Sequence, residues 1–249
     1  DAVRTIKGFP QLKDLPQVIG ESDPEGCAAC GMRTNPENAY RNGTMYSSYT
    51  AASFARKYLL ADSLQANLMG AVSWSFEFEN QPWFYGFRDL ATNGVDKPVL
   101  NVFRMFGKMQ GKRVEVSGNR MYNLQQFTDS SVRGQSDIGA LATKNERSAY
   151  IMIWNYHDED IREGNEEVSI SLSGLPIGNA RLTEYRIDQT HSNSYERWKE
   201  MGSPANPTAA QVKQLQNAGQ LYRSKKSKKM EMNETATVKI MLPRQAVVL

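Results

Sequence analysis

The stretch Leu15-Pro-Gln-Val-Ile-Gly-Glu21-Ser-Asp-Pro-Glu25-Gly-Cys-Ala-Ala-Cys30 leads from a short apolar run directly into carboxylates, a turn and two cysteines. Val18 and Ile19 are β-branched and predict a strand, and Asp23-Pro24 predicts that the chain then enters a loop. Glu21 is therefore expected at the C-terminal end of a strand. In a parallel α/β barrel this end forms the catalytic rim, where a carboxylate can act as a nucleophile or base. A surface loop acid and a buried structural pair are the alternatives.

Length and charge limit the classes of partner. The chain has 249 residues and a formal net charge of +3. A prior of roughly 150 residues per domain favours two domains, and so small a charge predicts no nucleic-acid partner. The basic run Lys225-Lys-Ser-Lys-Lys229 contains no aromatic residue, which favours a solvated hairpin or loop over a nucleic-acid patch. No apolar run reaches the ~20 residues of a membrane helix, so no membrane partner is expected.

Two cysteines, Cys27 and Cys30, form one C-x-x-C motif. A thioredoxin-like site needs this motif at the start of a helix in a βαβ unit, and a zinc site needs two further ligands. The histidines His157 and His191 are distant in sequence. We therefore expect no metal and no cofactor, and interpret the motif as a local disulfide or a pair of free loop thiols. A disulfide would imply an oxidising compartment, which favours a periplasmic or extracellular location.

The first part of the chain alternates between strand and helix patterns. Residues 44–65 predict a helix, because apolar residues recur at helical spacing. These residues are Ala51, Phe54, Ala55, Tyr58 and Leu59.

A second strand is predicted over residues 71–79, where apolar and polar side chains alternate with period two. Asp96 is expected to cap a further helix that begins near Pro98. The order β, α, β, α indicates parallel pairing, but two strands cannot bury such a sheet on both faces. This part of the chain is therefore expected to be incomplete.

After Gly111 the pattern changes to short strands separated by turn residues, which is typical of an antiparallel sandwich. The expected strands lie near residues 121–127, 138–142, 149–155, 167–172, 180–187 and 235–242. A short helix is predicted over residues 209–221, opened by Pro207-Thr208. The expected domains are 1–112 and 113–249.

The chain contains a series of motifs in a fixed order, which are Leu15 to Glu21, Trp74-Ser-Phe76, Phe78-Glu79, Tyr85-Gly-Phe87, Lys97-Pro98, Ile187-Asp-Gln-Thr-His191-Ser-Asn193-Ser-Tyr195, Met201-Gly-Ser-Pro204 and Pro207-Thr208. The first of these motifs resemble the last part of the catalytic barrel of glycoside hydrolase family 39, which contains β-xylosidases and α-L-iduronidases. The C-terminal motifs are similar to the β-sandwich end of the bacterial xylosidase branch, and the resemblance extends over nearly the whole chain.

This resemblance implies an α/β plus all-β fold, in which the C-terminal part of a (β/α)8 TIM barrel is followed by an antiparallel β-sandwich. It also implies hydrolysis of glycosidic bonds with retention of configuration. Glu21 falls where the family places its nucleophile, at the end of the seventh barrel strand. Gly20-Glu21-Ser22 departs from the common Thr-Glu-Trp, a difference that concerns the sugar pocket more than the nucleophile.

A retaining glycosidase needs a second carboxyl group roughly 5 Å from the nucleophile to act as acid and base. In the family this residue is a Glu that follows an Asn on the fourth barrel strand. That strand is expected upstream of Asp1, so this chain is expected to carry the nucleophile without the acid/base. Asp23 and Glu25 are too near Glu21 in sequence to face it across a sugar.

The resemblance also suggests substrate-binding residues. Trp74 would form the apolar floor beneath the sugar, with a plain barrel-core tryptophan as the alternative. Glu79 would bind sugar hydroxyls, with Glu77 as the competing candidate on the same strand face. Trp83 and Tyr85 would line the entrance, unless this aromatic loop packs on the sandwich instead.

Two further motif residues, His191 and Asn193, are interpreted as structural. They are expected to fix a loop of the sandwich against the barrel.

The resulting hypothesis is a fragment of an exo-acting, retaining glycosidase of the β-xylosidase type, inactive on its own. Its substrate would be a xylo-oligosaccharide or a related glycoside, and its partner the missing N-terminal half of the barrel. The rival hypothesis is a non-catalytic carbohydrate-binding or structural β-sandwich module with a barrel remnant.

Overall fold

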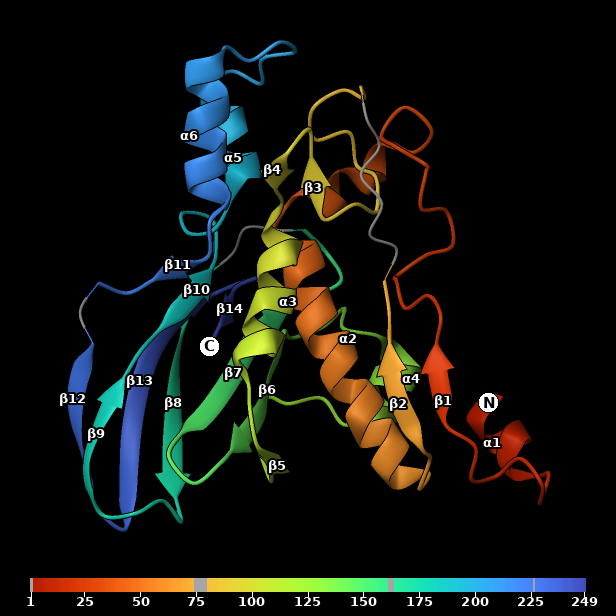
Figure 1. Ribbon diagram of the computed structural model, residues 1–249, viewed down its shortest axis with the longest axis vertical. Helices are drawn as coiled ribbons and strands as arrows, with labels where there is room; N and C mark the ends of the chain where they lie inside the picture. Colours follow the sequence, from red (N-terminus) through yellow and green to blue (C-terminus); the bar gives the residue numbers. More distant parts are fainter. Residues whose placement is uncertain (1, 74–79, 161–163, 226) are drawn as a thin grey trace.

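The structure is a computed structural model, and it describes residues 2–73, 80–160, 164–225 and 227–249. Helix α1 (Ala2–Lys7) precedes a pair of parallel strands, β1 (Gln17–Ile19) and β2 (Leu68–Ala71), which lie side by side in Figure 1. The 3₁₀ helix η1 (Pro36–Asn42) and the long helix α2 (Thr44–Ser63) connect them. Ile19 pairs with Ala71, so both strands end at the same edge of this small sheet.

The largest sheet is antiparallel and has six strands among the described residues, in the order β11-β10-β14-β7-β6-β5. Its longest ladder joins β6 to β7, from Asp137 opposite Tyr156 to Lys144 opposite Ala149. The strands are β5 (Lys112–Val114), β6 (Asp137–Lys144), β7 (Ala149–Tyr156), β10 (Tyr185–Ile187), β11 (Tyr222–Arg223) and β14 (Val247–Val248). Successive residues of β7 belong to two different cores, Met152 and Trp154 to one and Ile153 to the other, so the sheet has two apolar faces.

One face of this sheet packs against further strands. The ladder of β8 (Asn165–Ser173) with β13 (Thr235–Pro243) covers it, and the ladder of β9 (Gly178–Leu182) with β12 (Lys228–Met232) lies beyond. Ile153, Leu242 and Val248 form the buried centre between the layers. The predicted antiparallel sandwich is therefore present in this part of the chain.

The opposite face packs against helices α2 and α3 (Pro98–Lys108). Here Ala51, Ala52 and Ala55 of α2 contact a core that includes Met152 and Trp154 of β7. Small alanines let the helix approach the sheet closely. Helices of the first predicted domain and strands of the second thus share one core, while the boundary at residue 112 stays a prediction.

A buried carboxylate connects α2 to the six-stranded sheet. Asp137 of β6 accepts a hydrogen bond from Arg56 Nη2 of α2 at 2.5 Å and from Trp154 Nε1 at 2.8 Å. Its other oxygen accepts from the backbone N–H of Tyr122 at 2.9 Å. Asp137 is fully buried, so these three donors satisfy a charge that would be costly to bury without partners.

Two helices cover the loop that precedes α3. These are α5 (Ser194–Glu200) and α6 (Ala209–Gly219), at the upper left of Figure 1 beside the hairpin of β3 (Ala91–Thr92) and β4 (Val95–Asp96). The ring of Phe84 lies 5.3 Å from Trp198, and Asn101 donates to the carbonyl of Gly219 at 2.7 Å. These contacts fix the aromatic loop against the C-terminal half.

His191 and Asn193 make structural contacts within their own loop, whereas the expected role in fixing this loop against the barrel stays a prediction. Asn193 caps α5 through Glu196 N–H and donates to the carbonyl of Asp188. His191 Nδ1 lies 2.8 Å from Asp188 Oδ1. Burial opposes a low pKa for Asp188, but hydrogen bonds from Thr190 and His191 lower this pKa overall.

Several predicted elements are confirmed and others are wrong. Strands β6, β7, β8 and β13 lie where they were expected, and α6 begins at Ala209 with Thr208 as its cap. The predicted strand at 121–127 is wrong, because Asn123 and Gln126 form a capping box that opens helix α4 (Leu124–Ser130). The strand expected at 180–187 divides at Thr183 between two sheets.

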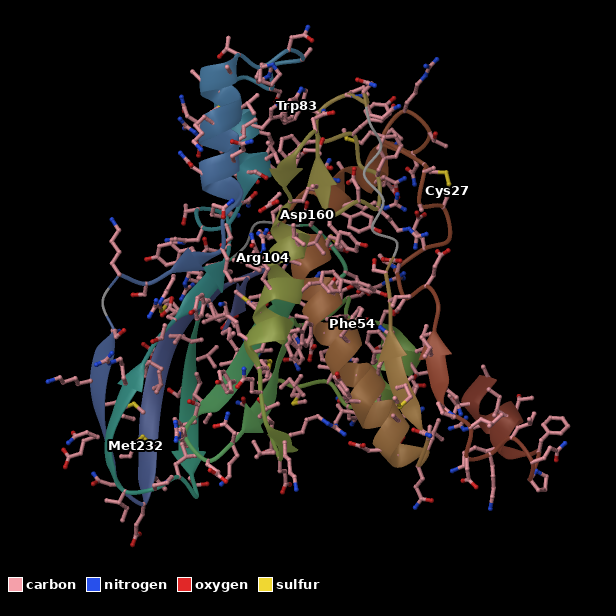
Figure 2. All side chains as sticks on the ribbon, in the orientation of Figure 1. Cys27, Phe54, Trp83, Arg104, Asp160 and Met232 are labelled. Atoms are coloured by element: carbon pink, nitrogen blue, oxygen red, sulfur yellow. A yellow bond between two sulfur atoms is a disulfide. The ribbon has the colours of Figure 1, made fainter. Side chains whose placement is uncertain are left out.

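Two predicted details near α2 and α3 also differ. Lys97, not Asp96, occupies the N-cap of α3, because Asp96 belongs to β4 and pairs with Arg104. On α2, Tyr58 and Leu59 are exposed rather than buried, because the core contacts of α2 involve its first half. Phe54, labelled in Figure 2, packs against Phe103 and Phe106 of α3.

Candidate active site

Glu21 follows β1 at the edge where both parallel strands end. The strand is shorter than predicted, but the carboxylate lies beyond its C-terminal end, as expected. Its side chain is 50% exposed, and Oε2 accepts a hydrogen bond from Arg88 Nη2 at 2.8 Å. Within the described residues Oε1 accepts no hydrogen bond. One carboxylate oxygen is thus fixed by a cation, and the other is available to a ligand.

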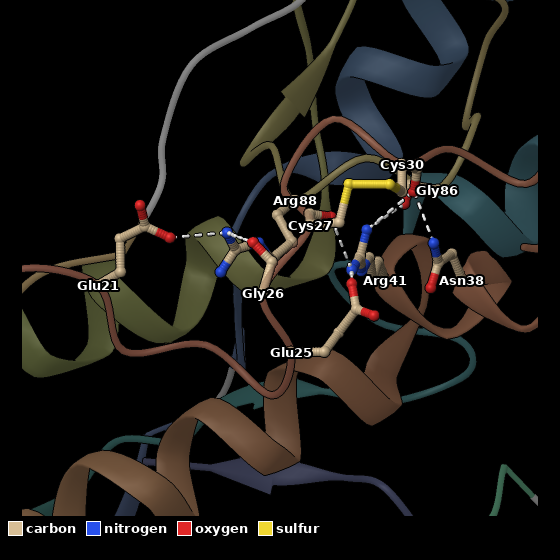
Figure 3. The surroundings of a disulfide bond; sticks show 9 residues. All are labelled: Glu21, Glu25, Gly26, Cys27, Cys30, Asn38, Arg41, Gly86 and Arg88. Carbon is tan, nitrogen blue, oxygen red and sulfur yellow. Dashed lines mark hydrogen bonds and ion pairs between the residues drawn. A yellow bond between two sulfur atoms is a disulfide. The ribbon is translucent and has the colours of Figure 1, made fainter. Parts of the chain in front are cut away.

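Arg88 is the central cation of the candidate site, shown in Figure 3. Its guanidinium is buried, yet it reaches two carboxylates, because Nη1 lies 2.8 Å from Asp23 Oδ2. Nη2 also donates to the carbonyl of Gly26 at 3.2 Å. The backbone N–H of Arg88 donates to the carbonyl of Ala28, so the loop after Glu21 holds this residue at both ends.

Asp23 anchors the other side of the guanidinium. Its side chain is only 2% exposed, and Oδ1 accepts hydrogen bonds from Tyr46 OH at 2.6 Å and from Ser73 Oγ at 2.7 Å. Burial and the neighbouring Asp23 charge raise the pKa of Tyr46 above its usual value. Tyr46 is therefore a neutral phenol that donates to the carboxylate. Residues from β1, α2 and the end of β2 meet at this point.

A second buried cation, Arg41 of η1, organises the loop between Gly26 and Cys30. It forms an ion pair with Glu25 and donates to the carbonyls of Cys27, Cys30 and Gly86. Burial, followed by the nearby Arg88, lowers the pKa of Arg41 to about 10, so it stays charged at neutral pH. The loop thus depends on two guanidinium groups for its shape.

Cys27 and Cys30 form a disulfide in this loop, which decides between the two interpretations of the C-x-x-C motif. The carbonyls of both cysteines accept hydrogen bonds from Arg41, and Asn38 Nδ2 donates to the Cys30 carbonyl at 2.6 Å. The disulfide therefore restrains the segment that carries the carbonyl groups around both arginines.

Loss of this disulfide is expected to lower the free energy of unfolding by about 2 kcal/mol. The cysteines are only three positions apart, and closing so short a loop removes little entropy from the unfolded chain. Chemical denaturation of Cys27→Ser/Cys30→Ser measures the loss, and the unmutated protein with a thiol reductant is the matched comparison. A midpoint that neither treatment changes would contradict the disulfide.

The aromatic candidates pack within the protein. Trp83 is half-buried against the cluster of Phe84, Val95 and Leu215, beside α6. Tyr85 lies edge-on to Phe87, and its ring occupies the space that a Cβ at Gly31 would need. Trp83 thus packs toward a helix of the C-terminal half, whereas Tyr85 packs on the loop at Gly31, and a substrate contact by either residue stays a prediction.

The other substrate-binding candidates, Trp74, Glu77 and Glu79, lie outside the described residues. Their neighbour Ser73 contacts Asp23, in the segment that follows Glu21. Among the described residues, no group of three His, Cys, Asp or Glu side chains is arranged to hold a metal ion. No helix in the same residues is both long and apolar enough to cross a membrane.

Sequence patterns did not identify Arg88, Arg41 or Tyr46 as members of the site. Arg88 stands directly after an aromatic run that ends in Phe87, and a cation in such surroundings indicates a buried ion pair. Its partners lie more than sixty positions earlier in the chain. Local patterns carry no information about pairing at this distance.

Comparisons with known proteins agree with the resemblance seen in the sequence. The family model of glycosyl hydrolases family 39 matches residues 1–232. A β-xylosidase from Caldicellulosiruptor saccharolyticus is 29% identical over 167 residues, which are 67% of this chain and 31% of that protein. The chain thus spans about a third of the length of this curated relative.

Solved structures show a similar fold. A bacterial orthologue of human α-L-iduronidase superposes with a TM-score of 0.79 at 18% identity, over 99% of this chain and 43% of that one. A monomeric β-xylosidase from Caulobacter crescentus CB15 gives a TM-score of 0.70 at 16% identity, over 99% of this chain and 47% of that one. The fold is therefore that of a portion of these enzymes.

Proposed function

This chain belongs to glycosyl hydrolase family 39, and we propose that it forms the C-terminal portion of a retaining, exo-acting glycosidase of the β-xylosidase type. In this proposal residues 1–112 complete a (β/α)8 barrel, and residues 113–249 form the sandwich domain. Glu21 is the nucleophile. The observation that carries the assignment is a half-exposed carboxylate at the C-terminal end of a parallel strand, fixed by the buried cation Arg88.

The chemistry assigns a role to each group. A retaining glycosidase forms a covalent glycosyl–enzyme intermediate, for which the nucleophile must be ionised and must present an oxygen to the anomeric carbon. Arg88 favours the charged form of Glu21 through a charge-assisted hydrogen bond to Oε2. Oε1 is then the attacking atom. We assign Trp74 to the floor of the sugar site and Glu79 or Glu77 to the binding of sugar hydroxyls.

We further propose that the rest of the barrel covers β1 and β2. Parallel sheets are normally buried on both faces, yet Val18 and Met69 are 63% and 67% exposed, and Leu15 and Val72 are also exposed. Exposed apolar groups on a two-stranded parallel sheet support additional strands and helices as the partner. The disulfide at Cys27 supports an oxidising compartment.

The acid/base residue is proposed to come from that partner. Asp23 and Glu25 are each paired with a buried arginine, so neither is placed to protonate a leaving group. We expect no turnover of an aryl β-xyloside by the purified 249-residue chain, whereas the complete enzyme should release the aryl group. Release by the chain alone at a rate near that of the complete enzyme would show that the acid/base has been misplaced.

A specific feature of the sandwich bears on the rival hypothesis of a carbohydrate-binding module. A cavity of about 1100 Å³ lies among β7, β8, β9, β12 and β13. Its lining includes Ile151, Ile153, Ile170 and Ile240, which also belong to the sandwich core. The lining also includes polar side chains such as Asn145, Asn179 and Arg181, which can form hydrogen bonds with sugar hydroxyls, so this cavity is the observation that favours the rival. Calorimetric titration of xylo-oligosaccharides into the complete enzyme tests it: binding unaffected by Glu21 or Trp74 substitution would support the rival.

A further inference from the structure

One guanidinium serves two carboxylates that differ sharply in environment. Arg88 contacts Glu21 through Nη2 and Asp23 through Nη1, both at 2.8 Å, although Asp23 is 2% exposed and Glu21 is 50% exposed. An arginine beside one carboxylate normally forms two parallel hydrogen bonds to it. Here Asp23 accepts from Nη1 of Arg88, so Glu21 accepts a hydrogen bond from Nη2 at a single oxygen.

The position of Asp23 is fixed from behind. Tyr46 OH and Ser73 Oγ both donate to Oδ1, so Oδ2 is directed to Arg88. Tyr46 is buried in the first turn of the twenty-residue helix α2, and Ser73 follows β2. The position of Asp23 therefore depends on helix α2 and on the end of strand β2, and Asp23 in turn fixes the guanidinium of Arg88.

Arg88 itself is not optimally satisfied in this arrangement. Its Nε is buried and has no hydrogen-bond partner among the described residues. A bidentate pair with one carboxylate would use that donor, and an unsatisfied buried donor costs free energy. Such local costs occur where function imposes a geometry. The guanidinium is thus held between two carboxylates at some cost to its own hydrogen bonding.

We propose that Asp23 is a positioning residue, which acts through Arg88 to limit the contact with Glu21 to one oxygen and to leave the other free for attack. The inference rests on the proposed function, in which Glu21 is the nucleophile. The negative charge of Asp23 also offsets the positive charge of Arg88. Arg88 can then orient Glu21 without greatly reducing the nucleophilicity of its carboxylate. Asp23 touches neither the substrate nor the reacting atoms.

Other charged groups surround the three residues. Arg41 of η1 and Lys57 of α2 each interact electrostatically with Asp23, and Asp89, which forms a buried ion pair with Lys97, interacts with Arg41. Glu25 lies on the same loop but pairs with Arg41. Glu77 and Glu79 lie outside the described residues. Among the described residues named here, Glu21 and Asp23 are the two whose carboxylates contact Arg88 directly.

The test is the pH dependence of kcat/KM in the complete enzyme, because its acidic limb reports ionisation of the nucleophile in the free enzyme. Asp23→Asn removes the charge that competes for Arg88, so Glu21 is held more tightly. We expect the limb to move to lower pH by about one unit and kcat to fall about tenfold or more. A merely structural role would lower the folded fraction and leave the limb unmoved.

A second variant is expected to shift the acidic limb in the opposite direction, and it also tests the inference if Asp23→Asn fails to fold. Tyr46→Phe/Ser73→Ala frees Oδ1 of Asp23 to accept a second hydrogen bond from Arg88, which draws the cation away from Glu21. The limb should then move to higher pH. Glu37→Gln, which alters an exposed acid of η1 outside this network, is the control and should leave the limb in place.

The outcomes separate this inference from the proposed function. An active Glu21→Ala enzyme overturns the nucleophile assignment and the inference with it. If Glu21→Ala is inactive but Asp23→Asn keeps the acidic limb at the wild-type pH, the nucleophile assignment stands and only the inference is overturned. Opposite limb shifts in the two variants, with the control unmoved, support it.

Discussion

In the complete enzyme, Glu21→Ala is expected to lower kcat by roughly 10⁴- to 10⁶-fold, the range found when a covalent nucleophile is removed. The reason is that Asp23, the other described carboxylate in contact with Arg88, cannot replace it, because Asp23 is buried and bound to Arg88, Tyr46 and Ser73. The aryl β-xyloside used above measures the loss.

Added azide should restore part of this activity. The shortened side chain leaves space for a small anion, which attacks the anomeric carbon directly and yields a glycosyl azide of inverted configuration. Glu37→Ala, which removes an exposed acid of η1, is the matched control and should retain normal activity. A Glu21→Ala enzyme with undiminished hydrolysis would refute the assignment.

Asp137→Ala is expected to lower the free energy of unfolding by about 3–5 kcal/mol, the range for breaking a buried ion pair by removing one partner. The substitution leaves Arg56 buried without its carboxylate and removes the acceptor of Trp154 Nε1 and Tyr122 N–H. Since Arg56 belongs to α2 and Asp137 to β6, the loss reports the contact between the helices and the sheet.

Denaturant unfolding followed by tryptophan fluorescence measures this effect, because Trp154 is one of the affected donors. The matched control is Glu167→Gln, whose pair with Lys239 is exposed by 56% and 64% on the two side chains. Exposed pairs contribute little, so the control should change stability by less than about 1 kcal/mol. Equal effects of the two substitutions would show that Asp137 does not hold α2 to the sheet.

Local patterns predicted correctly the elements whose own residues indicate the structure, through capping residues or through regular spacing of apolar side chains. Helix α6 is an example, because Thr208 and Gln211 form the capping box at its start. Strand β8 is another, because half-buried and exposed residues alternate along it. The same signal explains the failure at 121–127, where the capping residues Asn123 and Gln126 outweigh the apolar residues. Tyr58 and Leu59 follow the helical period, but both remain exposed, although Arg113 of β5 lies over the Tyr58 ring.

The candidate site divides in a similar way. The position of Glu21 after a short strand could be predicted from Val18, Ile19 and the Asp23-Pro24 turn. The role of Arg88 could not, because the contact joins positions far apart in the chain and depends on the disulfide loop between them. The ordered motifs over the whole chain indicated the family. The hydrogen bonds within the site could be identified only from the three-dimensional structure.

The most direct test of the account is covalent trapping of the nucleophile. A 2-deoxy-2-fluoro glycoside of the sugar that the complete enzyme hydrolyses, with a good leaving group, should accumulate as a glycosyl–enzyme, because the fluorine destabilises the oxocarbenium-like transition state of both steps. Proteolysis and mass spectrometry then locate the label. The account predicts a single glycosyl group on Glu21, and a label on any other carboxylate would contradict it.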